Sequence, residues 1–596
     1  MRYLRARSSA AVLVTGALVA GLVTNPVVAS TAGAATSGAT ATLAEPPGTY
    51  PNYILPLLTG AYYSVANIEQ FQRLSYRSLF WIGDHGKPVV NPTLSLANTP
   101  VYSDNNTVVN LTLGKWNWSD GTPVTSRDVT FWINLLEANK KNIAFYIPGE
   151  FPDNLKSYKV TGPESIQLNL TGPVNPTWFT YDQLSQITPI PQQTWDKTSA
   201  SGAVGNYDET PAGAVQVFNF LTAQSKDIAT YGTNPLWQTV DGPWALNQYQ
   251  SDGYVRFKAN PAYSGPDTHA IEYFVEEPFT TEAAELDVLR SGNSITYGYL
   301  PFQDAAQQPA LNSEGYQQYV WNDWGINYFV FNFHNPTVGP IFDQAYFRQA
   351  MQSLIDEQAF IKGPLNGFAV TDYGPVPAVP ATFATPLEIK GPWPYAPAKA
   401  VSMLKAHGWD VKPGGVSTCA SPGTAANECG AGIAAGAKLE FNLNYASGSV
   451  YVSEEMQGLK SDFSAAGIDV NLASAPFDTI ISQSAPCKSC SWEISNWGGG
   501  WLYGVNPYPT GDQIFGTGSG SNFSNYSSAT ADKLIDETVH GTASLAAYED
   551  YLATQIPVLW MPHQAYQVSE VSTKLHGALP ASPILELNPE NWTLSK

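Results

Sequence analysis

The chain contains 596 residues, and this length favours two to four domains over a single hydrophobic core. Hydrophobic residues make up 43% of it and charged residues only 13%, a composition typical of a folded globular protein rather than a disordered one. The formal net charge of −21 argues against a nucleic-acid partner, because phosphate binding needs clustered Lys and Arg.

The amino-terminal segment has the pattern of a secretory signal peptide. Three arginines precede the apolar run 10–23, and small residues follow at Ala29 and 32–34. The run is short for a membrane span, and the sequence contains no second apolar run long enough for one. No cysteine precedes Cys419, so we expect no lipid anchor. The sequence therefore predicts an extracytoplasmic protein that is secreted, on the cell surface or periplasmic.

The first half of the folded chain mixes strands and helices. Residues 109–113 and 166–170 alternate apolar and polar side chains, as strands do. Between them, Thr125 or Ser126 can cap a helix whose first turn carries Asp128. The apolar residues at helical spacing are Val129, Trp132, Ile133 and Leu136.

The second half has the pattern of an α/β protein. A helix is predicted over 397–408, with proline at its start and glycine after its last turn. Further on, the alternating stretch 439–445 is followed by a helix that Ser453 opens and Gly467 closes, and then by a strand at 468–472. This order predicts a βαβ unit.

We find none of the common catalytic patterns. HExxH, GxSxG, a P-loop and GxGxxG are all absent from the sequence, and the seven histidines are scattered. Adjacent carboxylates occur at 276–277, 454–455 and 536–537; we interpret the second pair through the helix dipole and the others as solvated surface. The sequence therefore predicts neither an enzyme nor a cofactor. The aromatic content and export keep a secreted polysaccharide hydrolase as an alternative.

Four cysteines occur in the chain: Cys419, Cys429, Cys487 and Cys490. In an oxidising compartment disulfides are the expected state, and we favour local pairing of the first two and of the last two. The last pair also has the spacing of zinc ligands, but its only candidate partners lie in a Gly/Ala-rich stretch. We therefore expect no metal site.

Several segments in fixed order resemble family 5 of the extracytoplasmic solute-binding proteins, the oligopeptide, dipeptide and nickel-binding class of ABC importers. The clearest match is 118–129, WSDGTPVTSRDV, which resembles that family's F-x-D-G-x-P-[LV]-T-A-x-D-V segment. In the match at 342–350, Asp343 can cap the helix that carries Phe347. The other matching segments are 242–246, 255–263, 331–333, 355–356, 374–377, 395–400 and 408–409.

The resemblance implies an α/β fold with mixed sheets, in which three domains form two lobes joined by a hinge, as in periplasmic binding proteins. The expected division is a signal peptide at 1–35, a flexible spacer at 36–49, a discontinuous domain I at 50–85, 195–310 and 565–596, domain II at 86–194, and domain III, the second lobe, at 311–564.

The resemblance also implies a ligand-binding loop at 496–507, NWGGGWLYGVNP, which is similar to the W-x-A-D-Y-N-x-P loop of the oligopeptide binders. The family's amine-binding Asp falls at Gly504, so either Asp512 substitutes for it or the ligand has no free amine. Packing of this loop beneath neighbouring helices is the other interpretation. The predicted ligand-binding residues are Tyr62, Tyr63, Trp324, Trp497, Trp501, Tyr503 and Asn506.

By this resemblance, the expected function is that of an exported, monomeric solute-binding protein. It would deliver a small organic ligand, a peptide, to the permease subunits of an ABC importer by hinge closure. Nickel or haem stays open as a ligand, although no His/Cys cluster supports either. A receptor or chaperone with the same fold and no transport role is the second alternative.

Overall fold

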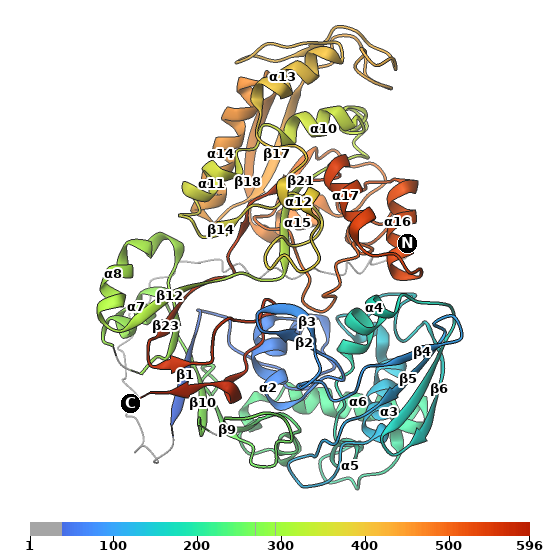
Figure 1. Ribbon diagram of the computed structural model, residues 1–596, viewed down its shortest axis with the longest axis vertical. Helices are drawn as coiled ribbons and strands as arrows, with labels where there is room; N and C mark the ends of the chain where they lie inside the picture. Colours follow the sequence, from blue (N-terminus) through green and yellow to red (C-terminus); the bar gives the residue numbers. More distant parts are fainter. Residues whose placement is uncertain (1–38, 269, 293, 596) are drawn as a thin grey trace, which may run out of the picture. The chain divides into compact units, whose positions relative to one another are not determined.

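The computed structural model describes residues 39–268, 270–292 and 294–595 and divides them into two compact units (Figure 1). Unit 1 comprises Trp324–Tyr503 and Pro509–Ala565. Unit 2 comprises the described residues up to Asp323, the segment Gly504–Tyr508, and the described residues from Tyr566 onward. The predicted signal peptide lies outside the described residues.

Unit 2 contains a seven-stranded mixed sheet in the order β12-β23-β11-β1-β10-β9-β8. Strand β1 pairs in parallel with β10 and β11, whereas the other pairs are antiparallel. The strands are β1 (Thr40–Glu45), β8 (Trp244–Tyr249), β9 (Val255–Ala259), β10 (Tyr273–Pro278), β11 (Tyr297–Tyr299), β12 (Tyr316–Trp321) and β23 (Gln567–Ser572).

Strand β1 corrects the expected flexible spacer at 36–49. Its residues Ala41, Leu43 and Ala44 are buried, and it lies inside the sheet (Figure 1). The segment 36–49 is rich in Ala, Thr, Gly and Pro, a composition that is also typical of a linker. The second lobe was expected to begin at residue 311, but unit 1 begins at Trp324 because β12 pairs with β23 of unit 2.

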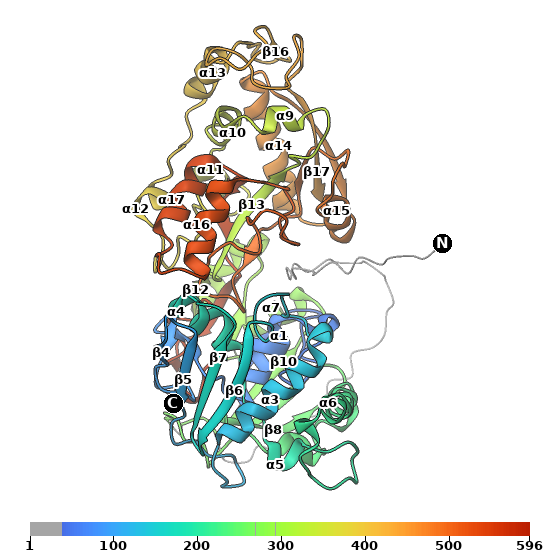
Figure 2. The ribbon, with the colours of Figure 1, turned by 90° about the vertical axis from the view of Figure 1, so that its right-hand side faces the viewer.

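A second sheet of unit 2 has the order β4-β5-β7-β6, and helix α3 lies along it (Figure 2). The predicted cap of α3 is confirmed as a capping box, since Asp128 Oδ2 accepts the Thr125 N–H at 2.8 Å and Thr125 Oγ1 accepts the Arg127 N–H at 3.3 Å. Helix α6 packs on α3. The elements are β4 (Val101–Ser103), β5 (Val108–Thr112), α3 (Ser126–Asn139), β6 (Leu155–Gly162), β7 (Ser165–Leu170) and α6 (Pro211–Ser225).

Unit 2 also contains shorter helices and strands. A helical stretch over 65–75 contains a π-helical turn between two short α-helical turns. These shorter elements include η1 (Gly60–Tyr62), α1 (Val65–Asn67), η2 (Ile68–Gln72), α2 (Arg73–Ser75), β2 (Trp81–Asp84), β3 (Lys87–Asn91), η4 (Phe179–Gln183), η5 (Leu184–Gln186), α7 (Glu282–Arg290) and α8 (Gln308–Ser313).

Unit 1 is built on a sheet in the order β18-β17-β19-β13-β20, with β21 also paired to β13. Strand β13 is buried along its whole length. The strands are β13 (Gly325–Phe331), β17 (Glu440–Ala446), β18 (Asp469–Ala475), β19 (Ile494–Asn496), β20 (Trp501–Leu502) and β21 (Leu559–Met561). The helices are α9 (Gly339–Phe342), α10 (Ala345–Gln352), α11 (Glu357–Lys362), α12 (Pro386–Lys390), α13 (Pro397–Ala406), α14 (Val450–Ala465), α15 (Phe477–Ser484), α16 (Ala529–Val539) and α17 (Ala546–Gln555).

The predicted βαβ unit is confirmed, because β17 and β18 pair in parallel and α14 connects them. Two helix starts differ from the prediction. Ser449, not Ser453, caps α14, since its Oγ accepts the Val452 N–H. Asp343 follows α9 at its C-terminal end and does not cap α10, whose preceding residue Gln344 makes no side-chain cap. Asp343 and Gln344 form a short break between α9 and α10.

The structure pairs Cys419 with Cys429 and Cys487 with Cys490, which is the local pairing that the sequence favoured. Both bridges lie in unit 1. Within the described part of the chain, no helix combines the length and the apolar character that crossing a membrane requires.

Candidate functional site

The predicted ligand-binding loop is anchored in unit 1 by its backbone. Strand β20 pairs antiparallel with β13, which aligns Trp501 with Ile326 and Leu502 with Gly325. The Tyr503 N–H continues the ladder by donating to the Trp324 carbonyl at 2.8 Å. The structure therefore brings Trp324 together with Trp501 and Tyr503, which follow it by more than 170 residues in the sequence.

Two glycines allow this loop to lie close to the sheet and to a helix. A Cβ on Gly500 would lie 1.9 Å from the Ile326 carbonyl oxygen, so only glycine fits beside β13. Gly498 has a φ of +85° and lies against Val452 of α14. Glycines in a predicted ligand-binding loop can let a ligand approach the backbone, but Gly500 makes its close approach to the protein's own backbone.

The aromatic residues of the loop differ in burial. Trp497 is only 3% exposed, with its ring centroid 5.6 Å from Tyr328 and 5.3 Å from Phe523. Tyr503 is fully buried and donates its hydroxyl to the Pro375 carbonyl at 2.8 Å. Trp324 is also fully buried. Trp501 alone of these four is half-buried, and its indole N–H has no hydrogen-bond partner among the described residues.

The five residues that follow, Gly504–Tyr508, belong to unit 2. The Tyr508 N–H donates to Asp182 Oδ1 at 2.8 Å, and the Val505 carbonyl accepts from Gln186 Nε2 at 3.3 Å. Asn506 is buried. Asp512, the expected substitute for the family's Asp, lies in unit 1, where its Oδ1 accepts from the Thr510 hydroxyl at 2.6 Å.

Tyr62 and Tyr63 lie in unit 2, just before the helical stretch 65–75, and both are half-buried. Tyr62 stacks on Tyr53 with ring centroids 4.6 Å apart. Burial and the nearby carboxylate of Glu69 raise the pKa of Tyr63, so its phenol is protonated at neutral pH. Thus the predicted residues are distributed over both units, and their role in ligand binding stays a prediction.

A cavity of about 40 Å³ lies in unit 2, with Val505 among its lining residues. Its polar lining residues lie in two segments, 72–76 and 185–188. Its apolar lining includes Pro56, Leu58, Ile68 and Phe145. The polar lining residues are Gln72, Arg73, Tyr76, Ser185, Gln186 and Thr188. Sequence reasoning missed this site; the i, i+4 spacing of Gln72 and Tyr76 on one helical face was the available signal.

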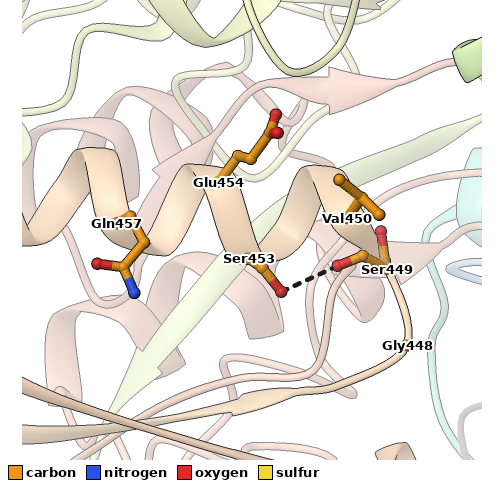
Figure 3. A pocket seen from close by; sticks show the side chains of 6 residues that line it. All are labelled: Gly448, Ser449, Val450, Ser453, Glu454 and Gln457. Atoms are coloured by element: carbon orange, nitrogen blue, oxygen red, sulfur yellow. Dashed lines mark hydrogen bonds between the residues drawn. The ribbon is translucent and has the colours of Figure 1, made fainter.

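A larger and shallower hollow of about 520 Å³ lies in unit 1, at the amino-terminal end of α14 (Figure 3). Val450 is 75% exposed there. The polar side chains are engaged locally, because Ser449 Oγ accepts the Val452 N–H and the Ser453 hydroxyl donates to the Ser449 carbonyl at 3.1 Å. This arrangement is that of a capped helix end.

The carboxylates considered for catalysis do not form an open acid–base pair. Glu276 and Glu455 are buried, which corrects the expectation of solvated or dipole-bound side chains. Burial raises the pKa of Glu455 to about 8, and burial and Glu45 raise that of Glu276 well above its ordinary value. Among the described residues, no group of three or more His, Cys, Asp or Glu could hold a metal ion.

Solved structures of solute-binding proteins share this fold. The oligopeptide-binding protein AppA from Bacillus subtilis, in complex with a nonapeptide, superposes with a TM-score of 0.61 at 18% identity, covering 94% of this chain and 99% of that one. NikZ from Campylobacter jejuni, in complex with Ni(L-His), gives a TM-score of 0.61 at 17% identity over 93% of this chain and 99% of that one. The expected mixed α/β fold of periplasmic binding proteins is confirmed.

The family model of bacterial extracellular solute-binding proteins, family 5, middle region, matches residues 91–521. The chain therefore belongs to family 5 of the extracellular solute-binding proteins. A putative ABC transporter peptide-binding protein of Brucella ovis is 23% identical over 342 residues, 55% of this chain and 56% of that protein. The match thus spans little more than half of that relative's length.

Proposed function

We propose that this chain is the exported solute-binding component of an ABC importer and that its ligand is a peptide, which it binds and releases unchanged. The observation that carries the proposal is the family match over 91–521. The printed names of relatives support it, among them a di/tripeptide-binding protein of Pseudomonas aeruginosa that is 31% identical over 169 residues. The partners of the monomeric protein are the permease subunits of the importer.

Hinge closure is the proposed mechanism. The chain passes between the units at Asp323–Trp324 and at Ala565–Tyr566, and the segment Gly504–Tyr508 is a further short excursion. A ligand that contacts both units favours the closed state by its differential affinity, and the importer recognises that state. Trp501 from unit 1, with Tyr62, Tyr63 and Asn506 from unit 2, are the proposed contact residues, and the buried Trp324, Trp497 and Tyr503 support the loop.

No observation favours the alternatives, a polysaccharide hydrolase or a receptor or chaperone without a transport role. The buried positions of Glu276 and Glu455 do not offer a substrate two facing carboxyl groups. The proposed location is extracytoplasmic, in keeping with the extracellular family.

Native mass spectrometry of the freshly purified protein tests the proposal. We expect additional masses that correspond to one bound peptide per chain, drawn from a mixture of sequences, because main-chain hydrogen bonds tolerate different side chains. Denaturation should release these peptides intact. A nickel chelate or a glycan fragment released in place of peptides would contradict the proposed ligand class.

A further inference from the structure

Two buried carboxyl groups meet in unit 1, where α12 packs on α17 (Figure 1). Glu388 of α12 is 1% exposed, and Glu549 of α17 is 0% exposed. Their side chains are hydrogen-bonded to each other. An ionised carboxylate can only accept a hydrogen bond, so this contact requires that at least one of the two groups carries a proton.

The opposite oxygen of each carboxyl group binds a backbone N–H group. Glu388 Oε1 accepts the Val376 N–H at 2.9 Å, and Glu549 Oε1 accepts the N–H of Thr385, the residue that caps α12. Among the described residues, no N–H or hydroxyl group donates to Oε2 of either side chain. The two Oε2 atoms are therefore the ones that can share a proton.

The ionisable groups around the pair are acids. Those that interact with the two carboxyl groups or with the phenols beside them are Asp372, Asp512, Asp550, Tyr503 and Tyr548. Lys390, at the end of α12, is exposed. None of the ion pairs among the described residues includes Glu388 or Glu549. Because these neighbours supply no positive charge, ionisation of both groups is unfavourable.

The proton of the pair belongs to Glu388. Burial, the hydrogen bond with Glu549 and the charge of Glu549 raise the pKa of Glu388 well above its usual range. Burial raises the pKa of Glu549 as well, but its hydrogen bonds with Glu388 and with the Thr385 N–H act in the opposite direction. Glu388 therefore donates, and Glu549 accepts.

The pair also supports the predicted ligand-binding loop through two adjacent residues. Val376, whose N–H donates to Glu388, follows Pro375, whose carbonyl accepts the Tyr503 hydroxyl at 2.8 Å. A Cβ on Gly374 would lie 2.1 Å from Glu388 Oε1, so the carboxyl group lies directly against the backbone of this segment. A movement of Glu388 would therefore displace the residues that hold Tyr503.

We infer that Glu388 and Glu549 are positioning residues: they hold one shared proton that keeps the segment 375–376 and, through it, Tyr503 and the loop in place, and loss of this proton weakens ligand binding. The step from the loop to the ligand rests on the proposed function, whereas the shared proton does not.

The sign of the pH dependence follows from the direction of the shift. Glu388 binds its proton more tightly in the folded state than in the unfolded chain, where its pKa is 4.5. The contribution of the pair is therefore complete below about pH 4.5 and is lost as the pH rises through the raised pKa of Glu388.

Amide hydrogen exchange of the full chain without ligand, between about pH 6 and about pH 9, tests the positioning role. We expect the protection of the Val376 and Tyr503 amides to fall by about tenfold relative to those of β17, the value of one buried hydrogen bond. Glu388→Gln should keep the protection at every pH, because its amide donates to Glu549 and its carbonyl accepts the Val376 N–H without a titrating proton.

Peptides eluted from the freshly purified protein are the probe for ligand binding, with affinities measured by calorimetry at the same pH values. Comparison of the wild type with Glu388→Gln at one pH cancels the ionisation of the peptides themselves. We expect equal affinities near pH 6 and about tenfold weaker binding by the wild type near pH 9. Glu276→Gln, which removes a buried acid of unit 2, is the matched control and should keep the wild-type pH profile.

Unchanged protection of Val376 and Tyr503 in the wild type, or an equal loss of protection in Glu388→Gln, would overturn the positioning role. The wild-type measurement decides this even if Glu388→Gln does not fold. Loss of protection together with equal affinities of wild type and Glu388→Gln near pH 9 would overturn the link to ligand binding. If no peptide elutes, the proposed function fails together with that link, and the exchange experiment still decides the role of the proton.

Discussion

Trp497 and Trp501 are four residues apart in one loop, but their different surroundings indicate different roles. Trp497 is only 3% exposed and packs between Tyr328 and Phe523, whereas Trp501 is half-buried. The indole N–H of each has no hydrogen-bond partner among the described residues. A partly exposed tryptophan offers a ligand a large apolar surface together with a polar N–H group. The two residues can therefore be separated by mutation.

We expect Trp501→Ala to weaken peptide binding by about 10- to 100-fold, the loss of one aromatic anchor, with a change in unfolding free energy below about 1 kcal/mol. Trp497→Ala should lower the unfolding free energy by about 3–5 kcal/mol, because it empties a packed aromatic site. Titration calorimetry and urea unfolding measure the two effects. Equal losses of binding and stability in both variants would contradict the distinction.

Glu276 shows how a buried acid couples stability to pH. Its side chain is fully buried in β10, and neither carboxyl oxygen has a hydrogen-bond partner among the described residues. Burial and the neighbouring Glu45 raise its pKa well above the ordinary value of 4.5, and burial raises that of Glu45 to about 7. Both groups bind protons more tightly in the folded state than in the unfolded chain.

The unfolding free energy should therefore fall as the pH rises from about 4.5 through 7. In this range the unfolded chain loses these protons readily, whereas the folded state must either ionise a buried carboxyl or hold its proton against the rising pH. We expect Glu276→Gln to be more stable than the wild type by about 1–3 kcal/mol at alkaline pH and to show a weaker pH dependence. Urea unfolding at several pH values measures this. The exposed Glu454→Gln is the control, and a parallel pH dependence of Glu276→Gln and wild type would refute the assignment.

At the scale of elements, the short pairing of β13 with β20 positions the predicted ligand-binding loop. Gly500→Ala would place a methyl group against the Ile326 carbonyl, so the loop must move away from the strand. We expect a loss of about 1–3 kcal/mol of unfolding free energy together with weaker peptide binding. Gly520→Ala, where a Cβ meets no atom within 4 Å, is the matched control. Unchanged melting temperature and affinity in Gly500→Ala would show that this contact does not position the loop.

The sequence predicted correctly those elements that are specified by residues close together in the chain. The Thr125–Asp128 capping box and the βαβ unit around α14 follow from cap residues and from periodicity, and the structure confirms both. Other features depend on contacts that the sequence does not display. Asp343 has the residue type of a helix cap, but it follows α9 and does not cap α10. Helix α14 begins about one turn earlier than predicted, because Ser449 rather than Ser453 caps it.

The same limit applies to the candidate site. Resemblance identified the loop 496–507, but the structure was needed to show that Gly500 serves strand pairing and that Trp497 is enclosed. The expected spacer became strand β1, because residues 273–278 and 297 lie beside it only after the chain has folded. The cavity at Tyr76 joins residues from four distant segments, which no local pattern reveals.

At the scale of the whole molecule, the proposed function requires the two units to close on a peptide and to release it unaltered. Small-angle scattering of the protein without ligand and saturated with the peptide that co-purifies with it is the most direct test. We expect a smaller radius of gyration in the saturated protein, reversed when the intact peptide is removed. An identical radius of gyration with and without saturating peptide would contradict it.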